Sequence, residues 1–272
     1  MTENANTASS TPDLTPPKDP LDAPENRKTR ARTVVLISTL VPVTMVILPK
    51  SLFPLFRDPL LLLWVVFGIM YYFQPQLTRA TRKVPGPIWL KFILFSVPAG
   101  WIGELCAWTG NFLDKNPEPP LLHPQLIPDL ILAIGYYGGW ACGWAIAFSL
   151  VRWSIPLVIL TVGTFGWVVE QKAALLISFF QNIATQPLGG AYWLLYIMMV
   201  YGCILCLGYI PVQIDFRPRF PKVPPWVHFL KIPVTWGLTW VGIMIILRAL
   251  MFLTGLLHII PEKRNIVEYP FF

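Results

Sequence analysis

Charged residues are scarce in this sequence, and their scarcity excludes several classes of protein. Of the 272 residues, 55% are hydrophobic and only 13% are charged, whereas an ordinary soluble domain carries about 25% charged residues. This balance excludes a soluble globular enzyme and a chain that is disordered throughout. The apolar run LLLLWVVFGIMYYF (60–73) also lacks the alternation of a β-barrel strand. We therefore expect an all-α, polytopic bundle of membrane-spanning helices.

Cysteine is rare as well, which excludes a disulfide scaffold. Cys203 and Cys206 have the CxxC spacing of a redox or zinc site. Their segment, YGCILCLGY, is apolar and contains no histidine or carboxylate, so that each cysteine resembles a small hydrophobic residue. We expect neither a metal site nor a cofactor.

The common catalytic motifs are missing too. The sequence contains no serine-hydrolase elbow, HExxH helix, Walker loop or Rossmann glycine fingerprint. Seven spans would also suit a rhodopsin-like receptor, but the last predicted span has no mid-helix lysine for a retinal Schiff base. Function must therefore be inferred from the few polar residues inside the apolar segments.

The apolar segments divide the chain into three parts. Residues 1–32 are polar and are expected to form a disordered cytoplasmic tail. Residues 33–262 contain seven apolar segments close to the roughly 20 residues that a helix needs to cross a membrane. Residues 263–272 are expected to form a short tail on the outer side. The predicted spans are 33–49, 60–76, 87–113, 127–153, 155–180, 190–212 and 233–260.

Basic residues are unevenly divided between the two sides of this arrangement. One side receives the N-terminal tail and three links rich in lysine and arginine, whereas the other side mixes bases with acids. The positive-inside rule then places the N-terminus in the cytoplasm and the C-terminus outside. The net charge of +7 is explained in this way, so we expect the lipid bilayer as partner and no nucleic acid. We expect a multi-pass protein of the bacterial cytoplasmic (inner) membrane. The bases of the three links are Arg79, Arg82, Lys83, Arg152, Arg217, Arg219, Lys222 and Lys231.

Three ionisable residues, Glu104, Glu170 and Arg248, lie well inside predicted spans. A charge at the bilayer centre costs at least about 2.5–3.5 kcal/mol, so such residues normally face protein or a water-filled cavity. Counted at about 1.5 Å per residue, all three reach a similar depth in the outer half. We hypothesise that Arg248 pairs with one or both glutamates, either as a functional site or as a structural ion pair.

Neighbouring polar residues indicate where a cavity would lie. Trp108 and Asn111 share the helix face of Glu104, and Gln171 directly follows Glu170. Tyr136 and Tyr137 fall near mid-membrane, where at least one hydroxyl group should find a partner. We therefore expect a cavity lined by Trp108, Asn111, Tyr137 and Gln171.

The predicted outer loop adds two further candidates, Asp129 and His123. Asp129 stands where the fourth span begins, so its carboxylate can cap that helix. Alternatively, Asp129 and His123 form the rim of a cavity whose floor holds the two glutamates. In that arrangement His123, which titrates near neutral pH, can relay protons.

Small residues recur every four positions along the fourth span. Gly135, Gly139, Gly143 and Ala147 form an extended small-xxx-small ridge. Such ridges allow close helix packing in membranes. We interpret this one as a structural contact.

Three functions are compatible with these features. The first is an intramembrane enzyme that acts on a lipid or isoprenoid by acid/base chemistry, with Glu104 or Glu170 as the acid and Asp129 or His123 as its helper. Aromatic residues, 14% of the chain, suit an apolar or carbocation-like substrate as well as ordinary packing. The second is a proton-coupled small-molecule transporter. The third is a noncatalytic subunit or assembly factor whose partner is a membrane protein.

Overall fold

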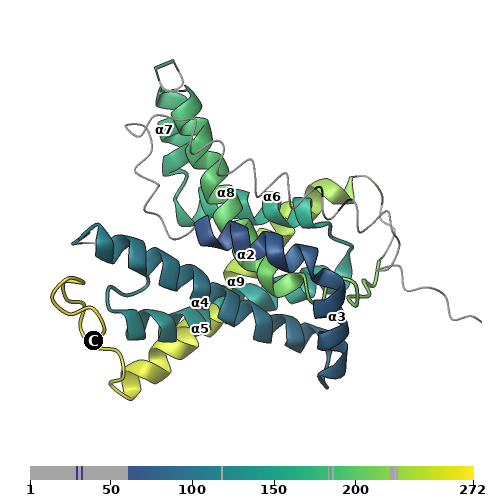
Figure 1. Ribbon diagram of the computed structural model, residues 1–272, viewed down its shortest axis with the longest axis horizontal. Coiled ribbons are helices and arrows are strands. Elements are labelled where there is room, and N and C mark those ends of the chain that lie inside the picture. Colours follow the sequence, from purple (N-terminus) through teal and green to yellow (C-terminus); the bar gives the residue numbers. More distant parts are fainter. Residues whose placement is uncertain are drawn as a thin grey trace, which may run out of the picture.

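The computed structural model describes Thr29, Arg32 and residues 61–117, 119–182, 184–185, 187–220, 224 and 226–272. This part of the chain is all-helical and contains no β-strand, which confirms the all-α prediction for it (Figure 1). The predicted first span (33–49) and nearly all of the predicted tail (1–32) lie outside the described residues. The helices are α2 (Leu61–Tyr72), α3 (Gln74–Lys83), α4 (Ile88–Leu113), α5 (Leu126–Leu150), α6 (Ile155–Phe165), α7 (Ala174–Asn182), α8 (Pro187–Tyr209) and α9 (Val227–Leu256).

Three of these helices are long and apolar enough to cross a membrane. They comprise Ile88–Leu113, Leu126–Leu150 and Phe229–Leu256, which coincide with the predicted third, fourth and seventh spans. Shorter apolar helices comprise Leu62–Tyr72, Ile155–Glu170 and Trp193–Tyr209. The count of seven spans stays a prediction.

The glycine ridge of α5 packs against α9. A Cβ atom at Gly139 would lie 2.5 Å from the carbonyl oxygen of Gly242, and one at Gly143 would lie 2.7 Å from the backbone of Leu238. Because the two backbones are this close, neither position has room for a side chain. Gly135 approaches Leu247 in the same row, and Ala147 is buried one turn further on.

On its other side, α5 packs against α4 and α8 around an aromatic core. The rings of Phe148 in α5 and Tyr209 in α8 stack with centroids 3.8 Å apart, and Phe92 of α4 meets Phe148 edge to face at 5.2 Å. Ser96 of α4 lies directly against Gly208 of α8, which lets the two helices cross closely. These contacts fix the three helices that carry most of the site.

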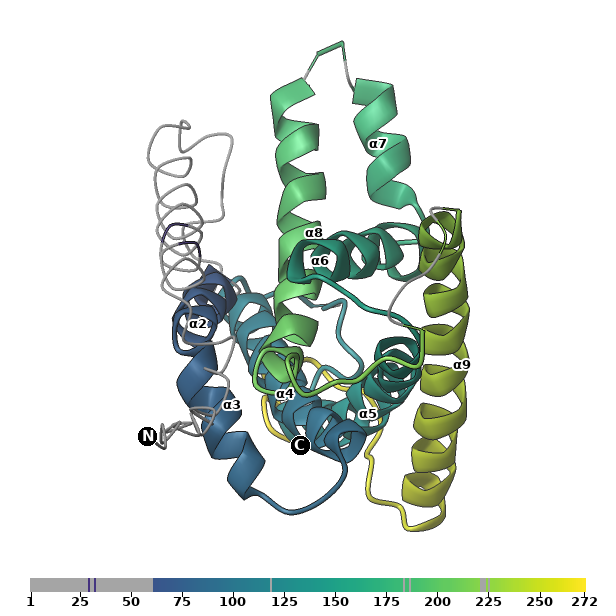
Figure 2. The ribbon, with the colours of Figure 1, turned by 90° about the vertical axis from the view of Figure 1, so that its right-hand side faces the viewer.

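The fifth apolar segment is not one continuous helix. After α6, the residues Gly166–Glu170 form a π-helical turn, and the chain then bends at Lys172 and Ala173, whose φ angles are 49° and 59°. Residues other than glycine rarely adopt such angles. The following helix, α7, pairs with α8 in a hairpin that projects from the rest of the bundle (Figure 2). The break therefore places Glu170 at the inner end of this hairpin.

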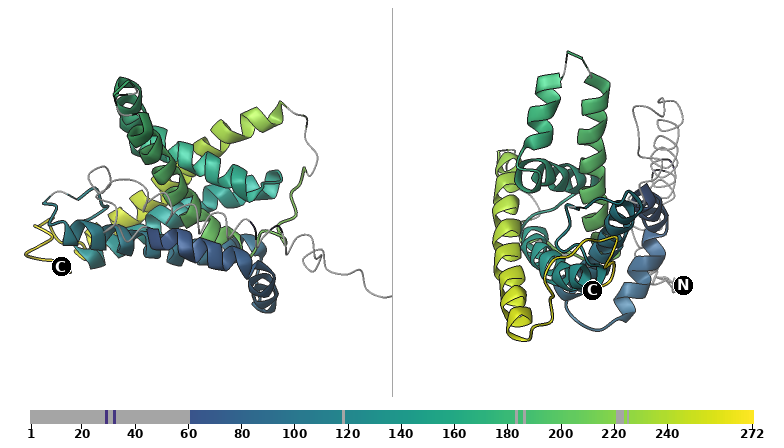
Figure 3. Two further views of the ribbon diagram at one scale, coloured as in Figure 1. Left: turned by 45° about the horizontal axis from the view of Figure 1, so that its top comes forward. Right: turned by 90° about the vertical axis from the view of Figure 1, so that its left-hand side faces the viewer.

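Three links gather at one end of the molecule. Arg82, in α3, forms an ion pair of 2.7 Å with Asp215, which follows α8. Val151, after α5, forms a bridge with Phe220, and the amide of Arg219 donates to the carbonyl of Ser149 at 2.7 Å. The C-terminal segment lies at the opposite end from α3 (Figure 3). The links that the sequence assigned to one side are thus close together.

Candidate functional site

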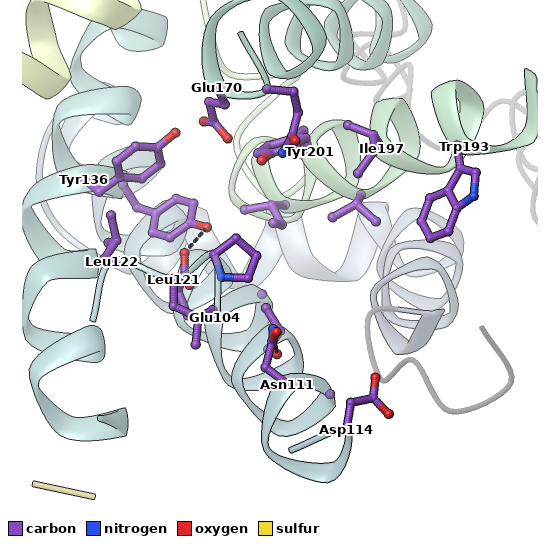
Figure 4. A pocket seen from close by; sticks show the side chains of 18 residues that line it. Glu104, Asn111, Asp114, Leu121, Leu122, Tyr136, Glu170, Trp193, Ile197 and Tyr201 are labelled. Atoms are coloured by element: carbon purple, nitrogen blue, oxygen red, sulfur yellow. Dashed lines mark hydrogen bonds between the residues drawn. The ribbon is translucent and has the colours of Figure 1, made fainter. Parts of the chain in front are cut away.

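A cavity of about 540 Å³ opens between α4, α5, α8, the π-helical turn and the loop after α4 (Figure 4). Its wall combines polar groups from several helices with an apolar strip along α8. The polar lining residues are Glu104, Asn111, Asp114, Tyr136, Tyr137, Glu170, Gln171 and Tyr201. The apolar part includes Ala107, Leu121, Leu122, Ile197, Val200 and Ile204.

Glu104 is held by a tyrosine of the neighbouring helix. The hydroxyl group of Tyr137 donates a hydrogen bond of 2.8 Å to Oε1 of Glu104 (Figure 4). This approach depends on Gly100, because a Cβ atom there would overlap the Tyr137 ring. The Tyr137 hydroxyl group therefore has a hydrogen-bond partner, as we expected for at least one of the two tyrosines.

Asp129 stands behind Glu104 and does not line the cavity. Its side chain is fully buried, and Oδ1 accepts a hydrogen bond of 2.9 Å from the backbone amide of His123. The side chain of Asp129 lies close to that of Glu104, and Oδ2 of Asp129 has no hydrogen-bond partner in the described part of the chain. Two negative charges this close would repel each other, so a charge on one carboxyl group disfavours a charge on the other. Glu104 and Asp129 thus form a pair of neighbouring acids.

Glu170 ends the π-helical turn and faces the same cavity. The turn is closed by the amide of Gln171, which donates to the carbonyl of Gly166 at 2.9 Å, and Gly166 packs against the ring of Tyr201. Oε1 of Glu170 is buried and has no hydrogen-bond partner among the described residues. Short π-helical turns occur frequently at functional sites. The buried oxygen without a partner marks Glu170 as a group that can receive one from a ligand.

The ring of His123 points away from the cavity, toward the C-terminal segment. Its Nδ1 accepts a hydrogen bond of 3.2 Å from the amide of Gln125, which leaves the proton on Nε2, 3.2 Å from the carbonyl oxygen of Pro261. Burial lowers the pKa of His123 and so favours the neutral ring. The His123 ring therefore does not line the cavity, whereas the backbone amide of His123 positions Asp129.

The C-terminal segment holds the beginning of α5, a role that sequence reasoning missed. Gln125 donates from Nε2 to the carbonyls of Arg264 and Tyr269, at 2.9 and 3.0 Å. The first amides of α5, those of Leu126 and Ile127, donate to the carbonyls of Pro270 and Phe271. These amides would otherwise lack partners. The sequence gives no signal for this contact, because most of its acceptors are backbone carbonyls.

Of the predicted lining residues, Asn111, Tyr137 and Gln171 line the cavity and Trp108 does not. The indole Nε1 of Trp108 donates to the carbonyl of Pro124 at 3.0 Å, and its ring stacks on Phe271 with centroids 6.1 Å apart. Trp108 therefore packs under the C-terminal segment.

Arg248 does not reach the glutamates. It is exposed on α9, does not line the cavity, and makes no ion pair with any residue in the described ranges. The reason lies in α5, which separates α9 from the cavity. Gly139 faces α9, and Tyr137, two positions away and so about 200° around the helix, faces α4. The similar depth that the sequence predicts for the three residues therefore does not bring Arg248 to the same side of α5 as the glutamates.

Across the described ranges, no group of three His, Cys, Asp or Glu side chains is arranged to hold a metal ion. No protein-family model, curated protein or solved structure matches this chain. We therefore base the functional proposal on Glu104 and Glu170, the two acids of apolar segments that line this cavity.

Proposed function

We propose that the chain is a multi-pass membrane protein with its N-terminus in the cytoplasm. Three helices of membrane-spanning length support this proposal. So does the end of the molecule where Arg82 and Arg219 meet links from other helices, because gathered basic links are typical of a cytoplasmic face.

We propose further that the cavity is the active site of an intramembrane enzyme that acts on a lipid or isoprenoid by acid/base chemistry. One observation carries this proposal: Glu104, bonded to Tyr137, and Glu170, with a carboxyl oxygen that lacks a partner among the described residues, line the same cavity. A volume of about 540 Å³ suits a ligand pocket, since these usually measure about 300–1,000 Å³.

The two glutamates take different roles. Glu104 lies beside a second acid, Asp129, so it acts as the general acid and recovers its proton from that neighbour. Glu170 has no such carboxyl partner described and acts as the base, or stabilises positive charge that develops on the substrate. The apolar strip of Ile197, Val200 and Ile204 holds the hydrocarbon part.

Transfer of a solvent-derived proton to substrate carbon tests this proposal. Purified protein is incubated with membrane lipid extract in D₂O, and lipids that gain deuterium on carbon are sought by mass spectrometry. The wild type should label one lipid, Glu104→Gln should abolish the labelling, and the exposed Glu268→Gln should not affect it. Equal labelling by Glu104→Gln, or no labelled lipid with the wild type, would contradict the proposal.

A proton-coupled transporter is the second candidate, and the break at Glu170 favours it. Transporters often bind substrate where a membrane helix is interrupted, and here the π-helical turn and the bend at Lys172 and Ala173 interrupt the fifth apolar segment. Proton-coupled uptake into proteoliposomes that is lost in Glu170→Gln, without deuterium labelling, would support transport over catalysis.

A further inference from the structure

The cavity has acidic residues on its wall and no basic ones. Glu104, Asp114 and Glu170 line it, whereas none of its described lining residues is lysine, arginine or histidine. Phosphate and carboxylate groups are usually recognised by arginine or lysine. An anionic group inside this cavity would meet like charge and no partner of opposite charge.

Two buried polar atoms of the wall also lack partners. Oε1 of Glu170 and the hydroxyl group of Tyr136 make no hydrogen bond with the described residues. Figure 4 shows the carboxyl group of Glu170 and the hydroxyl of Tyr136 directed toward the same part of the cavity. A buried polar group without a hydrogen bond is costly, so a ligand that donates to both would be stabilised there.

Aromatic rings form a further part of the cavity wall. Tyr136, Tyr137, Tyr201 and Trp193 all line the cavity. A cation that lies over such rings is attracted by their electron-rich faces. A carboxyl oxygen that lacks a partner, together with several aromatic rings, is a setting that favours a positive charge over a neutral group.

We infer that the cavity binds the protonated amine of an amphiphile, with the amine at Glu170 and the hydrocarbon chain along Ile197, Val200 and Ile204. An ammonium group supplies up to three donors, which suits both atoms that lack partners. It also gains Coulomb attraction, which is stronger away from water and which a neutral alcohol lacks. The inference rests on the proposed function and names the substrate class of that site.

Three ligands with the same eight-carbon chain test this inference. Octylamine, octanol and octanoate are titrated by calorimetry at pH 7 into protein purified in an uncharged maltoside detergent. Octylamine should bind at least about tenfold more tightly than octanol, as expected for a hydrogen bond to a charged group. Octanoate should bind least.

Variants show whether this preference arises in the cavity. Glu170→Gln should reduce the preference for octylamine over octanol to about twofold or less if that charged hydrogen bond is its source. The exposed Glu268→Gln, which removes the same charge elsewhere, should retain it. If Glu170→Gln does not fold, Glu104→Gln is measured in its place. The order of the three affinities in the wild type tests the inference without any variant.

Equal binding of octylamine and octanol to the wild type would overturn the inference, and so would tighter binding of octanoate. A preference that persists in Glu170→Gln, or in Glu104→Gln where that variant replaces it, would overturn it too, because the amine would then bind elsewhere. None of these results bears on deuterium labelling, so the acid/base proposal can survive them. Conversely, tighter binding of octylamine than octanol, without deuterium labelling of a lipid, would contradict only the acid/base proposal.

Discussion

The two sides of α5 make different kinds of contact, close backbone packing toward α9 and polar contacts toward α4. Toward α9, Gly139 and Gly143 remove side chains so that two backbones touch. Toward α4, Asp129 and Tyr137 place polar groups against Glu104 beside a cavity. The side toward α9 is tightly packed, whereas the side toward α4 borders the cavity and depends on hydrogen bonds. We expect changes of volume to damage the first side and changes of hydrogen bonding to damage the second.

The largest effect should come from a methyl group added to the α9 side. In Gly139→Ala the new Cβ would lie 2.5 Å from the carbonyl oxygen of Gly242, and backbone cannot rotate away. We expect a loss of about 3 kcal/mol in the free energy of unfolding, the upper part of the usual range for overpacking. Reversible unfolding in mixed micelles measures it.

Gly138→Ala is the matched control, one position along the same helix. A Cβ atom there would meet nothing within 4 Å among the described residues. Stability should be unchanged or raised by up to about 1 kcal/mol, because alanine favours helix more than glycine does. Equal losses in the two variants would show that α5 and α9 do not touch at Gly139.

The second largest effect should come from the loss of one hydroxyl group on the cavity side. Tyr137→Phe leaves Glu104 without its 2.8 Å hydrogen bond and should cost about 1.5–2 kcal/mol of unfolding free energy. It should also reduce deuterium labelling of the lipid. Tyr136→Phe removes a buried hydroxyl that has no partner in the described structure, so it should leave the free energy of unfolding unchanged or raise it. If the two variants behave alike, the bond to Glu104 does not contribute.

A smaller loss of stability should follow when the start of α5 loses its hydrogen bonds to the C-terminal segment. Gln125→Ala removes the hydrogen bonds to the carbonyls of Arg264 and Tyr269 and should cost about 1 kcal/mol. Amide hydrogen exchange should rise at Leu126 and Ile127, whose amides rely on the same C-terminal segment. Unchanged exchange at both amides would show that this segment is held in another way.

The smallest effect should appear in the pH dependence of stability. Burial lowers the pKa of His123 below its usual value of 6.5, so the unfolded chain takes up this proton more readily than the folded one. His123 therefore supports stability above pH 6.5, and this support declines as the pH falls through 6.5 toward the lowered pKa. His123→Gln should flatten the unfolding free energy between about pH 7.5 and 5.5, by about 1 kcal/mol or less. A wild type with the same slope as His123→Gln would contradict this assignment.

The sequence predicts the side of α5 toward α9 better than the side toward α4. Glycine at every fourth position of a helix indicates close packing against another helix, and the structure has this packing at Gly139 and Gly143. The long apolar helices follow from the composition of their segments. Glu104 and Glu170 are conspicuous for a similar reason, as acids in apolar segments.

Their partners could not be predicted in the same way. Depth along the bundle suggested Arg248, but depth does not reveal which helices are neighbours. Tyr137 reaches Glu104 because α5 lies between α4 and α9 and because Gly100 leaves room for its ring. That arrangement depends on contacts between distant segments, which no local pattern encodes.

The central claim is that Glu104 and Glu170 face one cavity that holds a lipid-like ligand. Mass spectrometry of the small molecules that co-purify with the protein tests it most directly, with wild type, Glu104→Gln, Glu170→Gln and Glu268→Gln prepared in parallel. We predict one amphiphile that is retained by the wild type and Glu268→Gln and is depleted in both cavity variants. Identical ligand content in all four proteins would contradict it.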